Sequence, residues 1–138
     1  QEAHSRIGPE FLMAVVSTMA ADLRAADHRH RKNPEAQELR NWLDTQIFAP
    51  TPSLDEMATK ISRSRGQTIR IFKSEYGETP VQYLIGRKIE AARELLRGSP
   101  VAIKEIADKL HFSDEYYFAS VFKRKTGIAP GRYRSWKN

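Results

Sequence analysis

One pattern of residues occurs twice in this 138-residue chain and restricts the fold more than any other feature. Four apolar or small positions recur at an offset of 49: Leu54, Met57, Ala58 and Ile61, then Ile103, Ile106, Ala107 and Leu110. Five more recur at an offset of 50: Phe72, Lys73, Gly77, Pro80 and Tyr83, then Phe122, Lys123, Gly127, Pro130 and Tyr133. Self-similarity of this kind indicates that one supersecondary unit is built twice. The change of offset predicts one inserted residue, placed after the capping Ser64 and Ser113.

Each copy is typical of a helix-turn-helix unit. A short apolar helix, a polar break and a longer helix that stops at Gly77 or Gly127 follow one another in each copy. Ala58 and Ala107 are small enough to let the paired helices approach closely. No window shows the alternation expected of a strand. We therefore predict an all-α fold in which helix-turn-helix subdomains at about 54–77 and 103–127 are joined by a long linker helix at about 79–97.

The segments outside the repeat are predicted to add further helices. Residues 11–33 are expected to form an N-terminal or linker helix, apolar at helical spacing to about residue 26. A second helix is expected from about Pro34 to Ile47, and a brief turn around 130–133. Residues 1–10 are expected to be vector-derived or disordered, because Gly8-Pro9-Glu10-Phe11 resembles a protease and cloning scar. Residues 34–138 then form the main domain.

Positive charge is concentrated in the part of the chain that holds the repeat. Residues 54–138 contain 17 Lys and Arg against 10 Asp and Glu, whereas residues 1–53 contain 6 against 7. A positive field confined to one region favours a polyanionic partner, either nucleic acid or an anionic membrane, although a basic solvated surface has the same composition. No apolar run approaches the ~18–20 residues that cross a bilayer, so a membrane is not expected.

Several classes of active site are excluded by composition. The chain contains no cysteine, which rules out disulfide frameworks, thiolate zinc sites and thiol nucleophiles. His28 and His30 could pair on a metal, but their basic polar neighbours favour solvated side chains. No P-loop, HExxH motif or nucleophile elbow occurs. We therefore predict no enzymatic activity, no cofactor and no metal site.

The outer face of the second helix in each unit is the candidate DNA-binding surface, because such a helix enters the major groove while the first helix braces it. Ile71 and Phe72, like Phe118, Val121 and Phe122, should point inward. Arg70 suits a bidentate bond to guanine, although a solvated helix arginine has the same pattern. Ser64 and Ser113, the predicted caps of the two longer helices, leave the N-termini of these helices available to phosphate. The predicted DNA-binding residues are Ser64, Arg65, Gly66, Gln67, Ile69, Arg70, Lys73, Ser113, Glu115, Tyr116, Ala119, Ser120 and Lys123.

The second copy closely resembles the C-terminal signature of the AraC/XylS family of bacterial transcription regulators. The matching segments are Ile103 to Phe118 and Val121 to Arg134, and Thr79 to Leu84 with Arg87, Lys88 and Ile89 is similar to the family's linker helix. The resemblance covers about residues 34–133. It implies a seven-helix, AraC-type DNA-binding domain over 34–138 whose two units reach adjacent major-groove segments on one face of the duplex.

The same resemblance implies which positions meet the bases. They are Gly66, Ile69 and Arg70 in the first unit, and Glu115, Tyr116, Ala119 and Ser120 in the second. Two departures matter: the family often has arginine where this chain has Ser120, and glycine where it has Ser62 or His111. A left-handed backbone at His111 would be strained. We therefore predict that the first unit dominates sequence reading, and that the second adds mostly phosphate and shape contacts.

Partners are implied by the resemblance as well. They are double-stranded DNA, RNA polymerase, and a sensor or dimerisation domain, commonly N-terminal, that is missing from this chain; the expected location is the cytoplasm. The competing hypothesis is a basic helical module that binds proteins without reading DNA sequence. Lys125, Arg132 and Arg134 are interpreted as surface charge. Salt dependence separates the two hypotheses, because phosphate neutralisation makes log K fall linearly with log salt.

Overall fold

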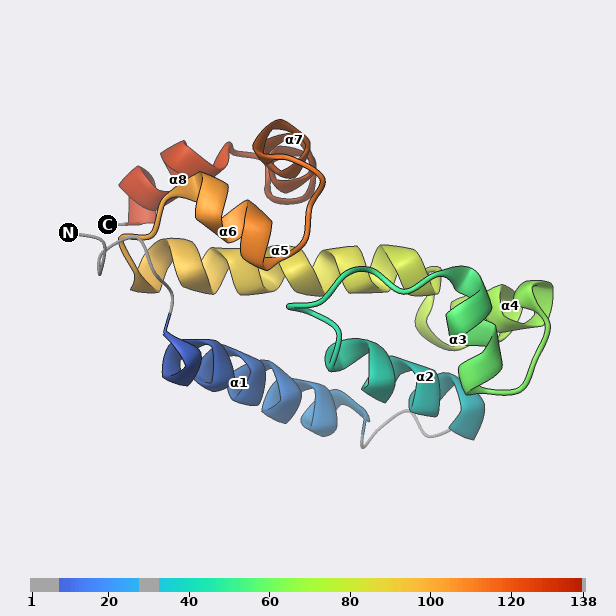
Figure 1. Cartoon of the computed structure of the whole chain (residues 1–138). Coiled ribbons are helices and arrows are strands. Elements are labelled where there is room, and N and C mark those ends of the chain that lie inside the picture. Colours follow the sequence, from blue (N-terminus) through green and yellow to red (C-terminus); the bar gives the residue numbers. More distant parts are fainter. Residues whose placement is uncertain (1–7, 28–32, 138) are drawn as a thin grey trace.

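Eight helices and no strand make up the part of the chain that the computed structural model describes, residues 8–27 and 33–137 (Figure 1). In order they are α1 (Pro9–Asp27), α2 (Pro34–Asp44), α3 (Leu54–Lys60), α4 (Arg65–Tyr76), α5 (Pro80–Gly98), α6 (Ile103–Lys109), α7 (Glu115–Thr126) and α8 (Pro130–Lys137). The predicted all-α class is confirmed. Residues 1–7 and 28–32, with His28 and His30, lie outside the described residues, and the predicted division into domains stays a prediction.

Local side-chain signals explain where several helices begin and end. The side chains of Ser53, Ser64 and Thr79 each accept a hydrogen bond from the backbone N–H three residues on. In return, the side-chain oxygens of Glu56, Gln67 and Gln82 accept one from the backbone N–H of the cap residue. These reciprocal pairs satisfy donors that a helix start leaves without partners. At the other end, Gly77 and Gly127 follow α4 and α7 with φ of 80° and 91°, a left-handed conformation that glycine adopts without strain.

Two predicted details of the helices are wrong. The second helix ends at Asp44, since Thr45 caps it and turns the chain, although Ile47 beyond it is still buried. The predicted brief turn at 130–133 is the start of α8, which continues to Lys137.

The N-cap of α7 is Asp114 rather than the predicted Ser113. Its Oδ1 accepts a hydrogen bond from the backbone N–H of Tyr117 at 2.7 Å. Aspartate and serine are equally good caps, so the two candidates could not be separated by residue type. Asp114 and Ser64 are 50 positions apart, the same offset as the rest of the two longer helices. The inserted residue is therefore Ser113, in the turn before α7.

The α5 helix is the element on which both units pack. In Figure 1 it runs through the middle of the molecule, with α1 and α2 on one side and α6, α7 and α8 on the other. Its buried positions include Leu84, Ile89, Ala92, Leu95 and Leu96, each no more than 2% exposed. Removing one such leucine side chain typically costs ~2–5 kcal/mol. The core therefore fixes both units to α5.

An aromatic pair joins each longer helix to the helix that follows it. The rings of Phe72 and Tyr83 meet edge to face with centroids 5.6 Å apart, and those of Phe122 and Tyr133 do the same at 5.4 Å. Such pairs contribute about 0.5–1.5 kcal/mol beyond their buried area. The repeated Phe and Tyr of the sequence are thus one packing device used twice.

Both tight turns contain a non-glycine residue in the left-handed region. Ser62, between α3 and α4, has φ 56°, and His111, between α6 and α7, has φ 60°. Both side chains are exposed. The expectation of a left-handed, strained backbone at His111 is confirmed, since this conformation costs ~1–2 kcal/mol for a residue with a Cβ.

Candidate nucleic-acid interface

The outer side of α4 carries the residues predicted for the first unit. Arg65, Gly66, Arg70 and Lys73 are exposed, while Gln67 and Ile69 are partly buried. On the inner side Phe72 is fully buried, whereas Ile71, also predicted to point inward, is only partly buried. The α4 helix therefore presents its cations outward, while its buried inner side holds it in place.

Arg70 and Lys73 are the cations of α4 that no other side chain neutralises. Among the described residues neither side chain makes a hydrogen bond or an ion pair. Arg65 differs, because its Nε lies 2.6 Å from Oδ1 of Asp55 on α3. Both members of that pair are more than half exposed, and such pairs contribute about 0–1 kcal/mol. Arg65 can therefore exchange Asp55 for another anion at little cost.

The outer side of α7 is chemically different. Tyr116 is 82% exposed, and Ser120 and Lys123 are exposed, while Glu115 and Ala119 are partly buried. The inward Phe118, Val121 and Phe122 are fully buried, as predicted. This face offers a ring and a hydroxyl where α4 offers a guanidinium.

The helix N-termini differ in charge. The α4 helix begins at the neutral Ser64 and has no acidic residue in its first turn, whereas α7 begins at Asp114 and continues with Glu115. A carboxylate at a helix N-terminus satisfies the dipole there, and a phosphate at the same place would be repelled. Because Ser113 is not the cap of α7, capping no longer supports a phosphate site there. Ser113 and Ser64 as DNA-binding residues stay predictions.

A buried lysine on α5, whose burial was not predicted from the sequence, contacts the backbone beside both units. Lys88, in the middle of α5, is 1% exposed, and its Nζ donates to the carbonyl oxygens of Ala49 at 2.7 Å and Leu110 at 2.6 Å. Burial lowers the pKa of Lys88 to about 8. Leu84, Lys88 and Ala92 follow one another at i, i+4 spacing, so a lysine within an apolar stripe was the available signal.

Two more polar contacts position the units. The Tyr83 hydroxyl on α5 donates to Oδ1 of Asp44 at 2.8 Å, and burial, helped by that carboxylate, raises the pKa of Tyr83. Arg134 on α8 donates from Nε to the carbonyl oxygen of Leu96 and from Nη2 to that of Ser99, each at 3.0 Å. The interpretation of Arg134 as surface charge is therefore wrong: it ties α8 to the end of α5.

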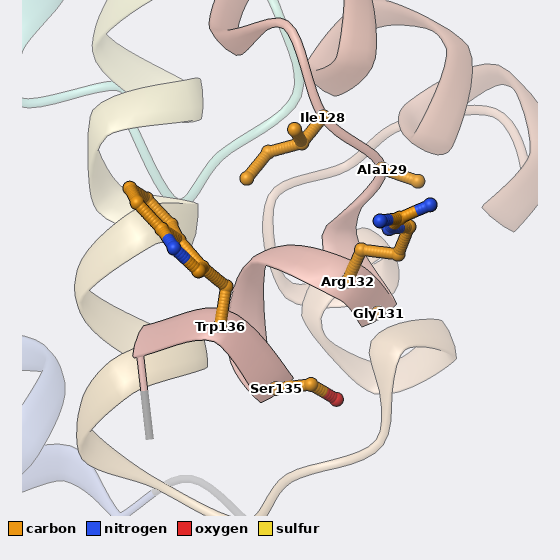
Figure 2. Close-up of a pocket in the computed structure, with 6 residues that line it drawn as sticks. All are labelled: Ile128, Ala129, Gly131, Arg132, Ser135 and Trp136. Atoms are coloured by element: carbon orange, nitrogen blue, oxygen red, sulfur yellow. The ribbon is translucent and has the colours of Figure 1, made fainter.

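A hollow of about 800 Å³ is lined by residues of α8 and of the segment just before it (Figure 2). Its lining is Ile128, Ala129, Gly131, Arg132, Ser135 and Trp136. It shares no residue with the predicted DNA-binding set. Elsewhere in the described residues, no group of three or more His, Asp and Glu is arranged to hold a metal ion. None of the described helices combines the length and the apolar character that crossing a membrane requires.

Comparison with known proteins relates this geometry to a family. A family model described as a helix-turn-helix domain matches residues 57–135. The HTH-type transcriptional regulator MtrA of Neisseria gonorrhoeae is 32% identical over 82 residues, which cover 59% of this chain and 27% of that protein. The matched part of the chain covers about a quarter to a third of the length of three such curated relatives.

Solved structures are similar over most of the chain. The DNA-binding domain of AdpA, a global transcriptional factor solved in complex with a target DNA, has a TM-score of 0.70 at 25% identity and covers 75% of this chain and 93% of its own. A Chromobacterium violaceum transcriptional regulator of the class with AraC-type DNA-binding domains has a TM-score of 0.69 at 28% identity, covering 75% and 92%.

Proposed function

This chain belongs to the AraC-type helix-turn-helix family, and from that membership we propose that it binds double-stranded DNA in a sequence-specific manner. It would act as the DNA-binding part of a bacterial transcription regulator. The α4 and α7 helices would enter adjacent major-groove segments on one face of the duplex, each braced by the shorter helix before it.

The observation that carries the proposal is that α4 and α7 each expose one face while both pack against the same helix, α5. Arg70 and Lys73 on α4 lack partners among the described residues, and Tyr116, Ser120 and Lys123 on α7 are exposed. Because α5 packs against α4 and α7, both faces are held in place before DNA arrives. Binding then requires little ordering of the protein.

The two units would contribute differently. On α4, Arg70 would read guanine, Ile69 would meet a thymine methyl, and Ser64, Arg65, Gly66, Gln67 and Lys73 would surround these contacts. On α7, Lys123 would bind phosphate, while Tyr116, Ala119, Ser120 and the acidic Glu115 would contribute mainly shape. The acidic start of α7 supports this division, because it weakens phosphate binding at that helix end.

The rest of the regulator enters the proposal through its relatives. Since those proteins are about twice as long as this chain, a sensor or dimerisation domain would control when the DNA-binding part engages its site. The complex would act on RNA polymerase in the bacterial cytoplasm. The family consists of DNA-binding regulators, and no catalytic step or cofactor is invoked for this chain.

Selection of bound sequences from random duplexes tests the proposal, followed by three alanine variants. Arg70→Ala should lose preference at one base pair by about 1–3 kcal/mol and keep its general affinity. Lys73→Ala should weaken binding to all sequences and reduce the slope of log K against log salt by about 1. Arg97→Ala, an exposed arginine at the end of α5, is the control and should change neither quantity.

Two results would contradict this reading at different levels. Uniform weakening by Arg70→Ala would mean that Arg70 touches only phosphate, which removes its reading role. Failure to enrich any sequence, with weak binding that salt does not alter, would favour the protein-interaction module instead. The similarity to a domain solved with its target DNA disfavours that alternative.

A further inference from the structure

Lys88 joins two parts of the molecule that are otherwise distant in the sequence. Its Nζ donates to the Ala49 carbonyl, 39 residues earlier in the chain, and to the Leu110 carbonyl, 22 residues later. The first belongs to the connection that leads into α3, and the second to the residue that caps α6. One side chain thus holds the entry to the first unit and the turn of the second unit.

Both acceptors occupy stiff points of the backbone. Ala49 is followed by Pro50, whose ring restricts the conformation of the residue before it. Leu110 is followed by His111, in the left-handed turn that leads to α7. A displacement of either carbonyl would therefore move the helix that follows it, rather than be absorbed by a flexible loop.

Core packing alone does not account for a lysine at this place. Burying an amine costs free energy that an apolar side chain of the same length would avoid, and Lys88 has no carboxylate partner among its hydrogen bonds. An apolar residue could not supply two directed hydrogen bonds, one to the connection before the first unit and one to the turn of the second unit. Buried polar groups of this kind can specify one arrangement of packed elements over its neighbours.

We propose that Lys88 is a positioning residue that fixes the separation of the two helix-turn-helix units, and thereby the spacing between DNA half-sites that the chain accepts. The inference rests on the proposed function. One added base pair moves the second half-site by ~3.4 Å along the axis and by about a tenth of a turn around it. Units held rigidly apart by one distance cannot follow that movement, whereas units freed from Lys88 can.

The test uses duplexes that carry both selected half-sites at the selected spacing, or with one base pair inserted or deleted between them. Wild-type protein should lose at least about tenfold in affinity on insertion or deletion, because the contacts of one unit are lost. Lys88→Met, which keeps all but the last atom of the side chain and removes the donor, should lose no more than about threefold. Lys88→Gln is also one atom shorter than lysine but polar, and it should relax the spacing as well because its amide falls short of the position from which Nζ reaches both carbonyls. The test therefore does not depend on the fold accepting an apolar group.

A matched control separates positioning from loss of stability. Ile89→Val alters the neighbouring buried residue of α5, lowers stability by ~0.5–1.5 kcal/mol and leaves both hydrogen bonds of Lys88 intact. It should keep the wild-type spacing penalty at a temperature where thermal melting shows every variant folded. Relaxed spacing in the Lys88 variants alone supports the inference.

The failures are distinguishable. If the Lys88 variants keep the full wild-type penalty, or if Ile89→Val relaxes it equally, Lys88 does not set the spacing, while sequence-specific binding still stands. If wild-type protein shows no sequence preference on any duplex, the proposed function fails and the inference fails with it.

Discussion

The two left-handed turns predict a stabilising substitution whose size follows from the backbone. His111 has φ 60° and an exposed side chain, so His111→Gly removes the conformational strain without removing a packed group. The relief is ~1–2 kcal/mol. Against it stands the ~0.5–1 kcal/mol that glycine adds to the entropy of the unfolded chain. The net expectation is a gain of about 0.5–1 kcal/mol in the free energy of unfolding, and the same for Ser62→Gly.

The assay is denaturant and thermal unfolding followed by circular dichroism. Each substitution should raise the unfolding midpoint with an unchanged m-value, and raise the melting temperature by roughly 2–5 °C. Because the two turns belong to different units, the double variant should gain the sum, about 1–2 kcal/mol. His111→Asn should fall between histidine and glycine, since asparagine tolerates the left-handed region.

Gly77→Ala is the matched control. Gly77 has φ 80°, and a Cβ built there would meet no atom within 4 Å, so only the backbone conformation opposes the alanine. A net loss of about 0.5–1 kcal/mol is expected, because the ~1–2 kcal/mol of strain is partly offset by the ~0.5–1 kcal/mol of unfolded-chain entropy that alanine removes. The reasoning is refuted if His111→Gly leaves the protein unchanged or less stable while Gly77→Ala is tolerated, because backbone strain would then not be the quantity that decides.

Three further predictions concern contacts that the sequence analysis missed or misassigned. Asp114→Ala should cost about 1 kcal/mol in urea unfolding and Ser113→Ala close to nothing; equal losses would return the cap to Ser113. Arg134→Met should cost about 1–3 kcal/mol because the carbonyls of Leu96 and Ser99 lose their donor, whereas Arg132→Met, on the exposed side of α8, should stay within about 0.5 kcal/mol; comparable effects would mean that the Arg134 contacts add nothing. Because burial lowers the pKa of Lys88 from 10.5 to about 8, the folded protein binds fewer protons than the unfolded chain between these values, so stability contributed by this group rises with pH there. The difference in free energy of unfolding between wild type and Lys88→Met should accordingly grow in favour of wild type by about 2 kcal/mol from pH 8 to pH 10, and a flat difference would show that the amine stays charged.

The helices were predictable where the same local pattern of residues occurs in both copies of the repeat. The Phe72 and Phe122 positions, with the glycines that end each longer helix, located both units because packing and turn geometry repeat together. The choice between Ser113 and Asp114 failed since both are good caps, although the offset of 50 would have decided it. The α8 helix was predicted only as a turn because it is short and opens with Pro130 and Gly131, and contacts with α5 hold it.

The candidate site was predictable in direction but not in its supports. The outward orientation of Arg70 and Tyr116 followed from helical periodicity, whereas their contact with DNA stays a prediction. Lys88 and Arg134 bind carbonyl oxygens of residues at least 22 positions away, and every residue type has such an oxygen. Their partners therefore leave no trace in the composition or spacing of the chain.

The repeated pair of Phe and Tyr rings determines where each packing unit of this protein ends. Tyr83 belongs to the first turn of α5 and Tyr133 to the first turn of α8, and each ring closes the core of the unit before it. The duplicated module is thus a helix-turn-helix together with the opening turn of its successor, and α8 is the shortened counterpart of α5. A single module transplanted into another protein must therefore include the first turn of the following helix. Without it, the longer helix of the module would lose the tyrosine ring that packs against its buried phenylalanine.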